Sequence, residues 1–229
     1  KQLKSSAWKR EVINIGGVTD SYQPIEAQYR LMPEVLRLLI KYKTPCIIST
    51  KSDLILRDYD LIAELAGMTY VNIAATITCM NEGMRKKIEP GGAPSLNRFA
   101  VLKAFAKTNA VTGLHFMPII PYLIDSFENI DALYYNASLC QVDYVLPGLL
   151  YLRGKTKKVF WDFIKQDFNH LYEPLQALYK TGSVSKEYKE KLYISVNKIK
   201  NHYGLSGNYI KPQKEKLKQL SAEQLTLFK

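Results

Sequence analysis

Between residues 11 and 145, the chain alternates short apolar runs with amphipathic stretches. The runs are rich in Val, Ile and Thr, which favour strands, and the stretches repeat apolar residues with a helical period. Strands that alternate with helices predict parallel βαβ units with right-handed crossovers. The predicted strands are Glu11–Ile15, Cys46–Ser49, Tyr70–Thr78, Thr112–Met117 and Gln141–Val145, and the helices are Met32–Tyr42, Asp58–Ala66, Ser95–Thr108 and Ser126–Asn136.

After Gly148 the pattern changes to helical periodicity without strands. We predict helices at Lys157–Gln166, Leu175–Lys180 and Ser185–Tyr203. Residues 206–223 are rich in Lys, Gln and Ser with little periodicity, which predicts a flexible tail. The expected organisation is therefore a βα domain over residues 1–150, a helical region over 151–205 and a tail over 206–229.

The charge is unevenly distributed along the 229 residues, whose net charge is +11. Residues 1–150 carry 16 basic against 14 acidic residues, whereas residues 151–229 carry 16 against 7. A basic C-terminal third favours a polyanionic partner, most often nucleic acid, although a Lys-rich solvated surface gives the same composition. No apolar run approaches about 18 residues and no signal peptide is recognised, so we expect no membrane association.

The three cysteines, Cys46, Cys79 and Cys140, lie in apolar surroundings at a spacing that matches no metal motif. This pattern predicts buried thiols in a reducing cytoplasm and no metal site within the chain.

Polar residues follow the predicted strands at their carboxyl ends. The first strand runs into Gly16 and Gly17, followed by Thr19 and Asp20. Paired glycines at the end of a buried strand let a ligand approach the backbone, although a tight turn without a ligand uses the same residues. Carboxyl ends of adjacent parallel strands meet at one edge, where βα-repeat proteins build their active sites. The later strands contribute Ser49–Ser52, Thr76, Thr78 and the run Met117–Pro121.

This set of groups suits a zwitterionic ligand. Lys51 and Thr76 can hold a carboxylate, the backbone of Gly16–Gly17 an ammonium, and Ile119–Ile120 a flat ring. Residues Glu89–Gly92 either brace this edge or form a plain turn. The histidines are dispersed, so no Ser-His-acid arrangement is predicted.

Five segments in order closely resemble radical S-adenosylmethionine enzymes related to spore photoproduct lyase, often called DNA repair photolyase-like proteins. They read GGVTDSYQP, PCIISTKSDLILRDYDLIAELA, VNIAATIT, KIEPGGAPSLNRF and GLHFMPIIPYLID. The resemblance covers residues 8–150 and extends more weakly over residues 172–205. It implies an α/β fold, a partial TIM barrel of six strands, with S-adenosylmethionine across the carboxyl ends of the strands.

By this resemblance, particular residues acquire expected roles. Gly16, Gly17 and Thr19 match the segment that holds the methionine amino group, and Lys51 and Thr76 match positions that hold its carboxylate. Near the adenine, the matching residues are Met117, Pro118, Ile119 and Ile120; Asp20, Tyr22 and Gln23 match a family loop without an assigned role.

The chain departs from the family at one motif. The family's chemistry uses a CxxxCxxC loop after the first barrel strand, whose thiolates hold a 4Fe–4S cluster that cleaves S-adenosylmethionine to a 5′-deoxyadenosyl radical. This chain lacks that motif and contains five of the six expected strands. We therefore expect the first strand and the cluster ligands upstream of residue 1, and no reductive cleavage by this chain alone.

The last residues include Gln224, Leu225, Leu227 and Phe228, in a pattern similar to the peptide by which bacterial repair and replication proteins bind the sliding clamp. A polar tether would present Leu and Phe as anchors for a groove. The alternative is a tail that packs on its own domain.

Three functions remain open from the sequence. The first is a radical S-adenosylmethionine lyase or repair enzyme that acts on nucleic acid. The second is a clusterless module that binds nucleic acid or the sliding clamp. The third is an ordinary barrel enzyme whose Gly16–Gly17 step cradles a phosphate.

Overall fold

A single parallel sheet forms the centre of the computed structural model, which describes residues 2–226 and the side chains of residues 2–219. The strand order follows the chain order, so each crossover advances one position, as in a barrel. The predicted α/β fold, a partial TIM barrel with a helical C-terminal extension, is confirmed. The strands are β1 (Ile13–Ile15), β2 (Cys46–Thr50), β3 (Val71–Thr76), β4 (Val111–Ile119) and β5 (Tyr144–Leu149).

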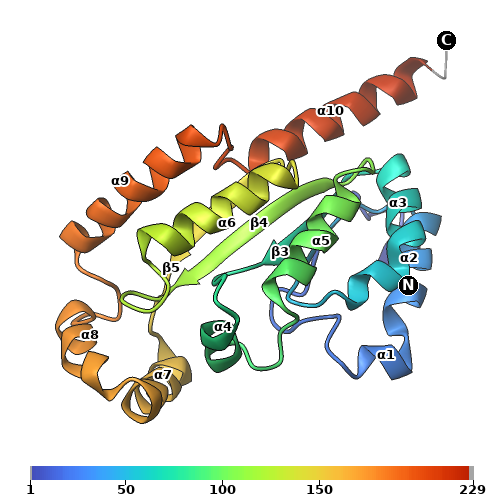
Figure 1. The fold of residues 1–229 in the computed structure, drawn as a ribbon. Coiled ribbons are helices and arrows are strands. Elements are labelled where there is room, and N and C mark those ends of the chain that lie inside the picture. The colour runs from blue at the N-terminus through green and yellow to red at the C-terminus, as the bar shows by residue number, and fades with distance from the viewer. Residues whose placement is uncertain (1, 227–229) are drawn as a thin grey trace.

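Helices follow each strand and cover one face of the sheet (Figure 1). The α-helices are α1 (Glu26–Tyr29), α2 (Leu31–Lys41), α3 (Tyr59–Met68), α4 (Glu82–Ile88), α5 (Ser95–Phe105), α6 (Phe127–Leu139), α7 (Gly154–Asp167), α8 (Tyr172–Leu178), α9 (Lys186–His202) and α10 (Ile210–Thr226). Three short 3₁₀ helices are η1 (Gln2–Lys4), η2 (Leu54–Asp58) and η3 (Asn169–Leu171).

Alternate strand residues divide between the two faces of the sheet. On the helix-covered face, Ile48 and Ile73 pack with Leu36, Ile62 and Phe105 of the surrounding helices. Further along the sheet, the same face continues into a second apolar core, to which α9 also contributes. That core includes Ala75, Leu114, Phe116, Val145, Leu102, Leu133, Val196 and Ile199.

The other face is the concave side of the half-barrel. Near the amino ends of the strands, it carries a small apolar cluster that includes Val111, Ile47 and Leu146, and a buried polar chain runs through it. His115 Nε2 lies 3.1 Å from the Tyr144 hydroxyl, which donates to Asn72 Oδ1 at 3.2 Å. Asn72 Nδ2 in turn donates to the Tyr70 hydroxyl at 3.0 Å. Thr76, at the carboxyl end of β3, is half-buried.

The C-terminal helices pack at the carboxyl edge of the sheet and beside α6. Phe160, Ile164 and Leu175 of α7 and α8 form a core with Ile120 and Ile124, which follow β4. Helix α9 runs alongside α6 (Figure 1). Within residues 2–226, we find no helix with the combination of length and hydropathy that crossing a bilayer requires.

Side-chain caps mark the starts of three helices among the described residues. Asn81, Ser126 and Ser185 cap α4, α6 and α9 by accepting from the N–H groups of Met84, Asn129 and Tyr188. Ser95 is the first helical residue of α5 and donates to the Cys79 carbonyl. The short helices α1 and α4 were not predicted, because each has too few residues to show a helical repeat of apolar positions.

The largest difference is α10, a helix where an irregular tail was expected. It is polar on most of its surface, and Leu217 packs against Tyr70, Val111 and Tyr144. One apolar anchor produces no helical period, which is why the pattern indicated a tail. Gln224 and Leu225 lie in the helical backbone, whereas their side chains, and all of Leu227 and Phe228, lie outside the described residues.

Gly113 on β4 tests how the concave face is packed. A Cβ at Gly113 would lie 2.0 Å from the Tyr144 ring, which is fully buried and hydrogen-bonded. We predict that Gly113→Ala lowers the free energy of unfolding by about 2 kcal/mol, because the ring must shift. Chemical denaturation measures the change.

The matched control is Gly67→Ala on α3, where a Cβ meets no atom within 4 Å. There the loss of backbone freedom in the unfolded chain should raise stability by about 0.5 kcal/mol. Equal effects of the two substitutions would contradict the packing shown by the structure.

Candidate functional site

The predicted site residues lie along the carboxyl edge of the sheet. Gly16 follows β1, Lys51 follows β2, Thr76 ends β3 and Met117 lies near the end of β4. The register pairs Ile15 with Ile48 and continues across to β4. The strand ends are therefore neighbours in space, as the sequence predicted.

Gly16 is required by the backbone itself. Its φ is +87°, and a Cβ would lie 2.3 Å from the Ser49 carbonyl oxygen. Any side chain would therefore strain the backbone and push the loop away from β2. At Gly17 a Cβ would lie 3.0 Å from Asn14 Nδ2, a side chain that can give way more easily. The Gly-Gly step thus presses the loop after β1 against the end of β2.

Asp20 fastens this loop in place. Its carboxylate accepts from the Tyr22 N–H at 2.8 Å, from the Thr50 hydroxyl at 2.8 Å and from the Lys51 N–H at 2.6 Å. Both carboxylate oxygens accept hydrogen bonds within the protein, so Asp20 holds the loop to the end of β2 and is not free to bind a ligand. The neighbouring residues Thr19 and Gln23 are exposed.

The loop after β1 also contacts a buried network of charged side chains, which the sequence pattern did not indicate. Arg57, in η2, pairs with Glu26 and with Asp58, each at 2.8 Å, and Asp58 accepts from the hydroxyl of fully buried Tyr22. Burial, and then the adjacent Asp58 carboxylate, raise the pKa of Tyr22, so its hydroxyl stays protonated. Glu26 also caps α2 by accepting from the N–H groups of Leu31 and Met32.

A second buried pair supports Lys51. Arg98 of α5, only 1% exposed, donates to the Thr76 carbonyl at 2.7 Å and pairs with Glu89 at 2.6 Å. The other oxygen of Glu89 lies 3.4 Å from Lys51 Nζ. A Cβ at Gly92 would lie 2.1 Å from Arg98 Nη2, so glycine is needed there. The segment Glu89–Gly92 therefore braces the edge, which was one of its two interpretations from sequence.

A cavity of about 390 Å³ lies between the loop that contains Asp20 and the segment Glu89–Gly92. Lys51 is the cationic residue in the lining of this cavity, and its side chain is 42% exposed. Of the residues predicted to bind the cofactor, only Lys51 lines it; Gly16, Gly17, Thr19, Thr76 and Met117–Ile120 do not. The lining residues are Asp20, Tyr22, Gln23, Pro24, Lys51, Ser52, Ile88, Glu89, Pro90, Gly91 and Gly92.

The apolar residues at the end of β4 divide into two pairs. Met117 and Pro118 are half-buried. Ile119 is fully buried and Ile120 is 5% exposed. The side chains of Ile119 and Ile120, which the sequence suggested for holding a flat ring, both pack in apolar clusters, so Met117 and Pro118 are the more accessible pair.

The cysteines are free and buried, as predicted, and they belong to three different apolar clusters. Burial raises the pKa of Cys46 to about 12, which keeps its thiol protonated. No group of three or more potential metal-ligating side chains occurs in the part of the chain that the structure describes. Burial lowers the pKa of His115 to about 4, so this histidine is neutral at pH 7.

No protein-family model matches the sequence. Uncharacterized proteins of Mycobacterium tuberculosis and Mycobacterium bovis are 29% identical over 228 residues, which is 99% of this chain and 67% of each relative. An uncharacterized protein of Methanocaldococcus jannaschii is 33% identical over 113 residues, covering 49% of this chain and 42% of the relative.

Among solved structures, a cysteine-to-serine mutant of spore photoproduct lyase is similar, with a TM-score of 0.60 at 13% identity. The match covers 84% of this chain and 58% of the lyase chain, so this chain spans little more than half of that enzyme. Streptococcus suis SuiB bound to S-adenosylmethionine matches with a TM-score of 0.45 at 14% identity, over 68% of this chain and 35% of SuiB. The likeness to the lyase shows that the chain shares the fold of that part of the enzyme.

The buried pair of Glu26 and Arg57 predicts that the stability of the protein depends on pH. Burial opposes the charge of Glu26, but hydrogen bonds from Arg57, Met32 and Leu31 outweigh it and lower its pKa. The stability that Glu26 contributes is therefore present above its unfolded pKa of about 4.3 and is lost as the pH falls through the lower folded value. We expect Glu26→Gln to lower the free energy of unfolding by on the order of 2 kcal/mol at pH 7.

Thermal unfolding of both proteins from pH 7 to pH 3 measures this effect, and the difference should shrink below about pH 4. The control is Glu34→Gln on α2, which removes an exposed pair with Arg37 and should change stability by less than about 0.5 kcal/mol. A difference for Glu26→Gln that stays constant across the pH range would refute the charged role of Glu26.

Proposed function

We propose that this chain forms the barrel of a radical S-adenosylmethionine enzyme of the spore photoproduct lyase-like type. The observation that carries the proposal is the carboxyl edge of the sheet. Segments that are far apart in the sequence, Asp20–Pro24, Lys51 and Glu89–Gly92, line one cavity there, and the Gly16–Gly17 step sets the first of them against the end of β2. The fold similar to spore photoproduct lyase supports the same assignment.

The chemistry of the edge fits S-adenosylmethionine, which carries an ammonium, a carboxylate and an aromatic ring. Lys51 can bind the carboxylate because its present partner is only a 3.4 Å contact with Glu89, and Arg98 holds the other oxygen of Glu89 in any event. The backbone carbonyls around Gly16–Gly17 suit the ammonium, and Met117 with Pro118 suits the ring.

The three cysteines do not fit a 4Fe–4S cluster. They are buried in separate clusters, whereas such a cluster needs its thiolates around one point. In our proposal the cluster ligands are supplied from outside this chain. With the cofactor bound beside a reduced cluster, one electron from the cluster would supply radical chemistry toward the substrate. The residues of this chain bind and orient the cofactor.

Nucleic acid is the substrate class that we propose, in a cytoplasmic setting. Exposed Arg153, Lys155 and Lys157 stand at the start of α7, just beyond the end of β5. No acidic residue occupies the first turn of this helix. A cationic segment at the edge that holds the cofactor would bring phosphates close to the reaction centre.

A clusterless accessory module is the second candidate. It is favoured by the sequence Gln224–Phe228, which is similar to a sliding-clamp peptide and begins within the last turn of the lysine-rich helix α10. In that function the barrel is a scaffold, and the C-terminal motif carries the activity by binding the clamp.

Lys51→Ala tests the cofactor assignment. We predict about a tenfold loss of affinity for S-adenosylmethionine, because a charge-assisted hydrogen bond to the carboxylate is removed. Isothermal titration calorimetry on the protein from its full reading frame measures the affinity. Lys107→Ala is the control, since Lys107 is exposed between α5 and β4 at the opposite edge. Unchanged affinity in Lys51→Ala would exclude the carboxylate role.

Iron content separates the two candidate functions. For the enzyme, anaerobic reconstitution of the protein expressed from its full reading frame should give about four irons per chain and absorbance near 400 nm. A full reading frame without a cysteine triplet, and a protein that takes up no iron, would reject the enzyme and favour the accessory module.

A further inference from the structure

A second hollow lies at the opposite edge of the sheet from the candidate site. It is formed where the N-terminal segment meets the end of α2, just before β1 and β2 begin. The five residues of β2 separate the two edges by about 17 Å, at roughly 3.3 Å per residue. The hollow has a volume of about 470 Å³. It shares no lining residue with the cavity beside Lys51, so the two are distinct.

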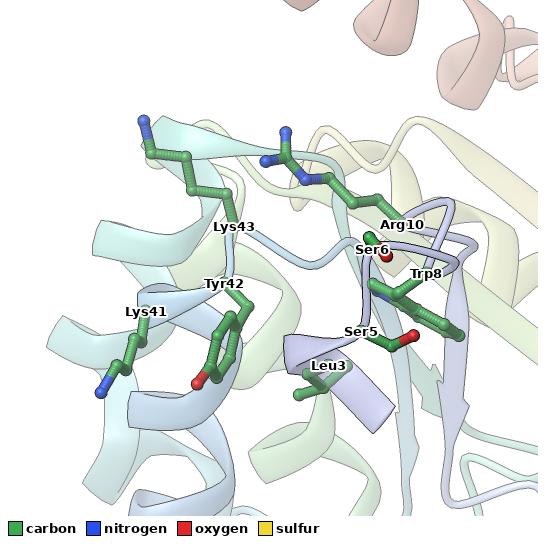
Figure 2. A pocket seen from close by; sticks show the side chains of 8 residues that line it. All are labelled: Leu3, Ser5, Ser6, Trp8, Arg10, Lys41, Tyr42 and Lys43. Atoms are coloured by element: carbon green, nitrogen blue, oxygen red, sulfur yellow. The ribbon is translucent and has the colours of Figure 1, made fainter. Parts of the chain in front are cut away.

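Figure 2 shows how the lining is arranged. Arg10 and Lys43 extend to the same side of the hollow, whereas Lys41 points to the opposite side. The rings of Trp8 and Tyr42 line it from the two different segments. Of the described side chains that line it, none is acidic; they are Leu3, Ser5, Ser6, Trp8, Arg10, Lys41, Tyr42 and Lys43.

The cations here are not neutralised by the protein. Within residues 2–219, no carboxylate lies within salt-bridge distance of Arg10, Lys41 or Lys43. The indole N–H of Trp8 is buried and has no hydrogen-bond acceptor among the described residues. A buried donor without an acceptor is unusual, and it lines the same hollow as Arg10 and Lys43, two cations without a described carboxylate partner. The third cation, Lys41, lies 5.9 Å from the centre of the Tyr42 ring.

The backbone holds two of these cations in place at an energetic cost. Arg10 has a φ of +54° and Lys43 a φ of +44°, in the left-handed region that residues other than glycine rarely adopt. The Ile13 N–H donates to the Pro45 carbonyl at 3.0 Å, and the Thr44 N–H donates to the Leu39 carbonyl at 2.9 Å. The first bond joins the segment after Arg10 to the segment after Lys43, and the second closes the turn that contains Lys43, so both residues stand on segments held by backbone hydrogen bonds.

We propose that this hollow binds the phosphate group of a nucleotide, either free or within a strand. Arg10 and Lys43 would donate to the phosphate oxygens, and Trp8 and Tyr42 would contact the sugar or base. Unpaired cations beside aromatic rings are the combination by which proteins hold nucleotides without reading their sequence. The site would anchor a nucleotide away from the cofactor cavity.

The decisive variant is Arg10→Gln combined with Lys43→Gln, which removes both charges but keeps side chains of similar length. Its control is Lys4→Gln combined with Lys9→Gln, which removes the same charge from the same segment outside the hollow. Each protein is titrated with a labelled single-stranded hexathymidylate, with adenosine monophosphate and with inorganic phosphate. Thermal unfolding checks that each variant is folded.

We expect the Arg10/Lys43 variant to lose about tenfold or more in affinity for one or both nucleotide probes, and the control to lose less than about twofold. The slope of log affinity against log salt should also fall by about 1 for the oligonucleotide. Binding of adenosine monophosphate would identify a free nucleotide as sufficient, and binding of the oligonucleotide alone would identify a strand.

Three results would overturn the proposal. The wild-type protein could bind neither nucleotide probe, or the control variant could lose as much affinity as the Arg10/Lys43 variant. Inorganic phosphate could also bind as tightly as both nucleotide probes, which would mean that Trp8 and Tyr42 make no contact with a nucleotide.

Discussion

The carboxylate of Asp20 is the interaction on which the carboxyl edge depends. It joins the loop after β1 to the end of β2 through the Thr50 hydroxyl and the Lys51 N–H. The contact is possible only because Gly16 lets the loop lie against the Ser49 carbonyl. A short strand of three residues, β1, is thereby held in register, and the cavity beside Lys51 acquires a fixed wall.

The other wall depends on a buried charge pair. Arg98 reaches from α5 to the Thr76 carbonyl and to Glu89, and Glu89 reaches on to Lys51. A buried ion pair of this kind contributes little net stability, because desolvation offsets the attraction. Its value here is positional, since it sets where Lys51 stands while leaving that side chain partly exposed. Lys51 is thus positioned by a single 3.4 Å contact with Glu89 and remains 42% exposed beside the cavity.

The sequence could predict the sheet and the glycine turn because each follows from a local pattern. Val- and Ile-rich runs define β2 to β4, and Gly16 stands where a left-handed residue was needed. It could not predict Arg98 or Arg57 as buried, because an arginine in a helix normally faces water and only distant partners draw it inside. The burial of Ile119 was missed for a related reason: an apolar residue can face a ligand or a helix with equal ease.

The distribution of charge makes the two edges of the sheet chemically different. At the carboxyl edge, the two cations Lys51 and Arg98 are matched by the two carboxylates of Glu89 and Asp20. A balanced set of charges favours a ligand that is itself balanced, such as a zwitterion. At the amino edge the cations Arg10 and Lys43 have no described carboxylate partner, so that edge favours a ligand with a net negative charge. The two edges of one sheet therefore differ in the charge that they present to a ligand.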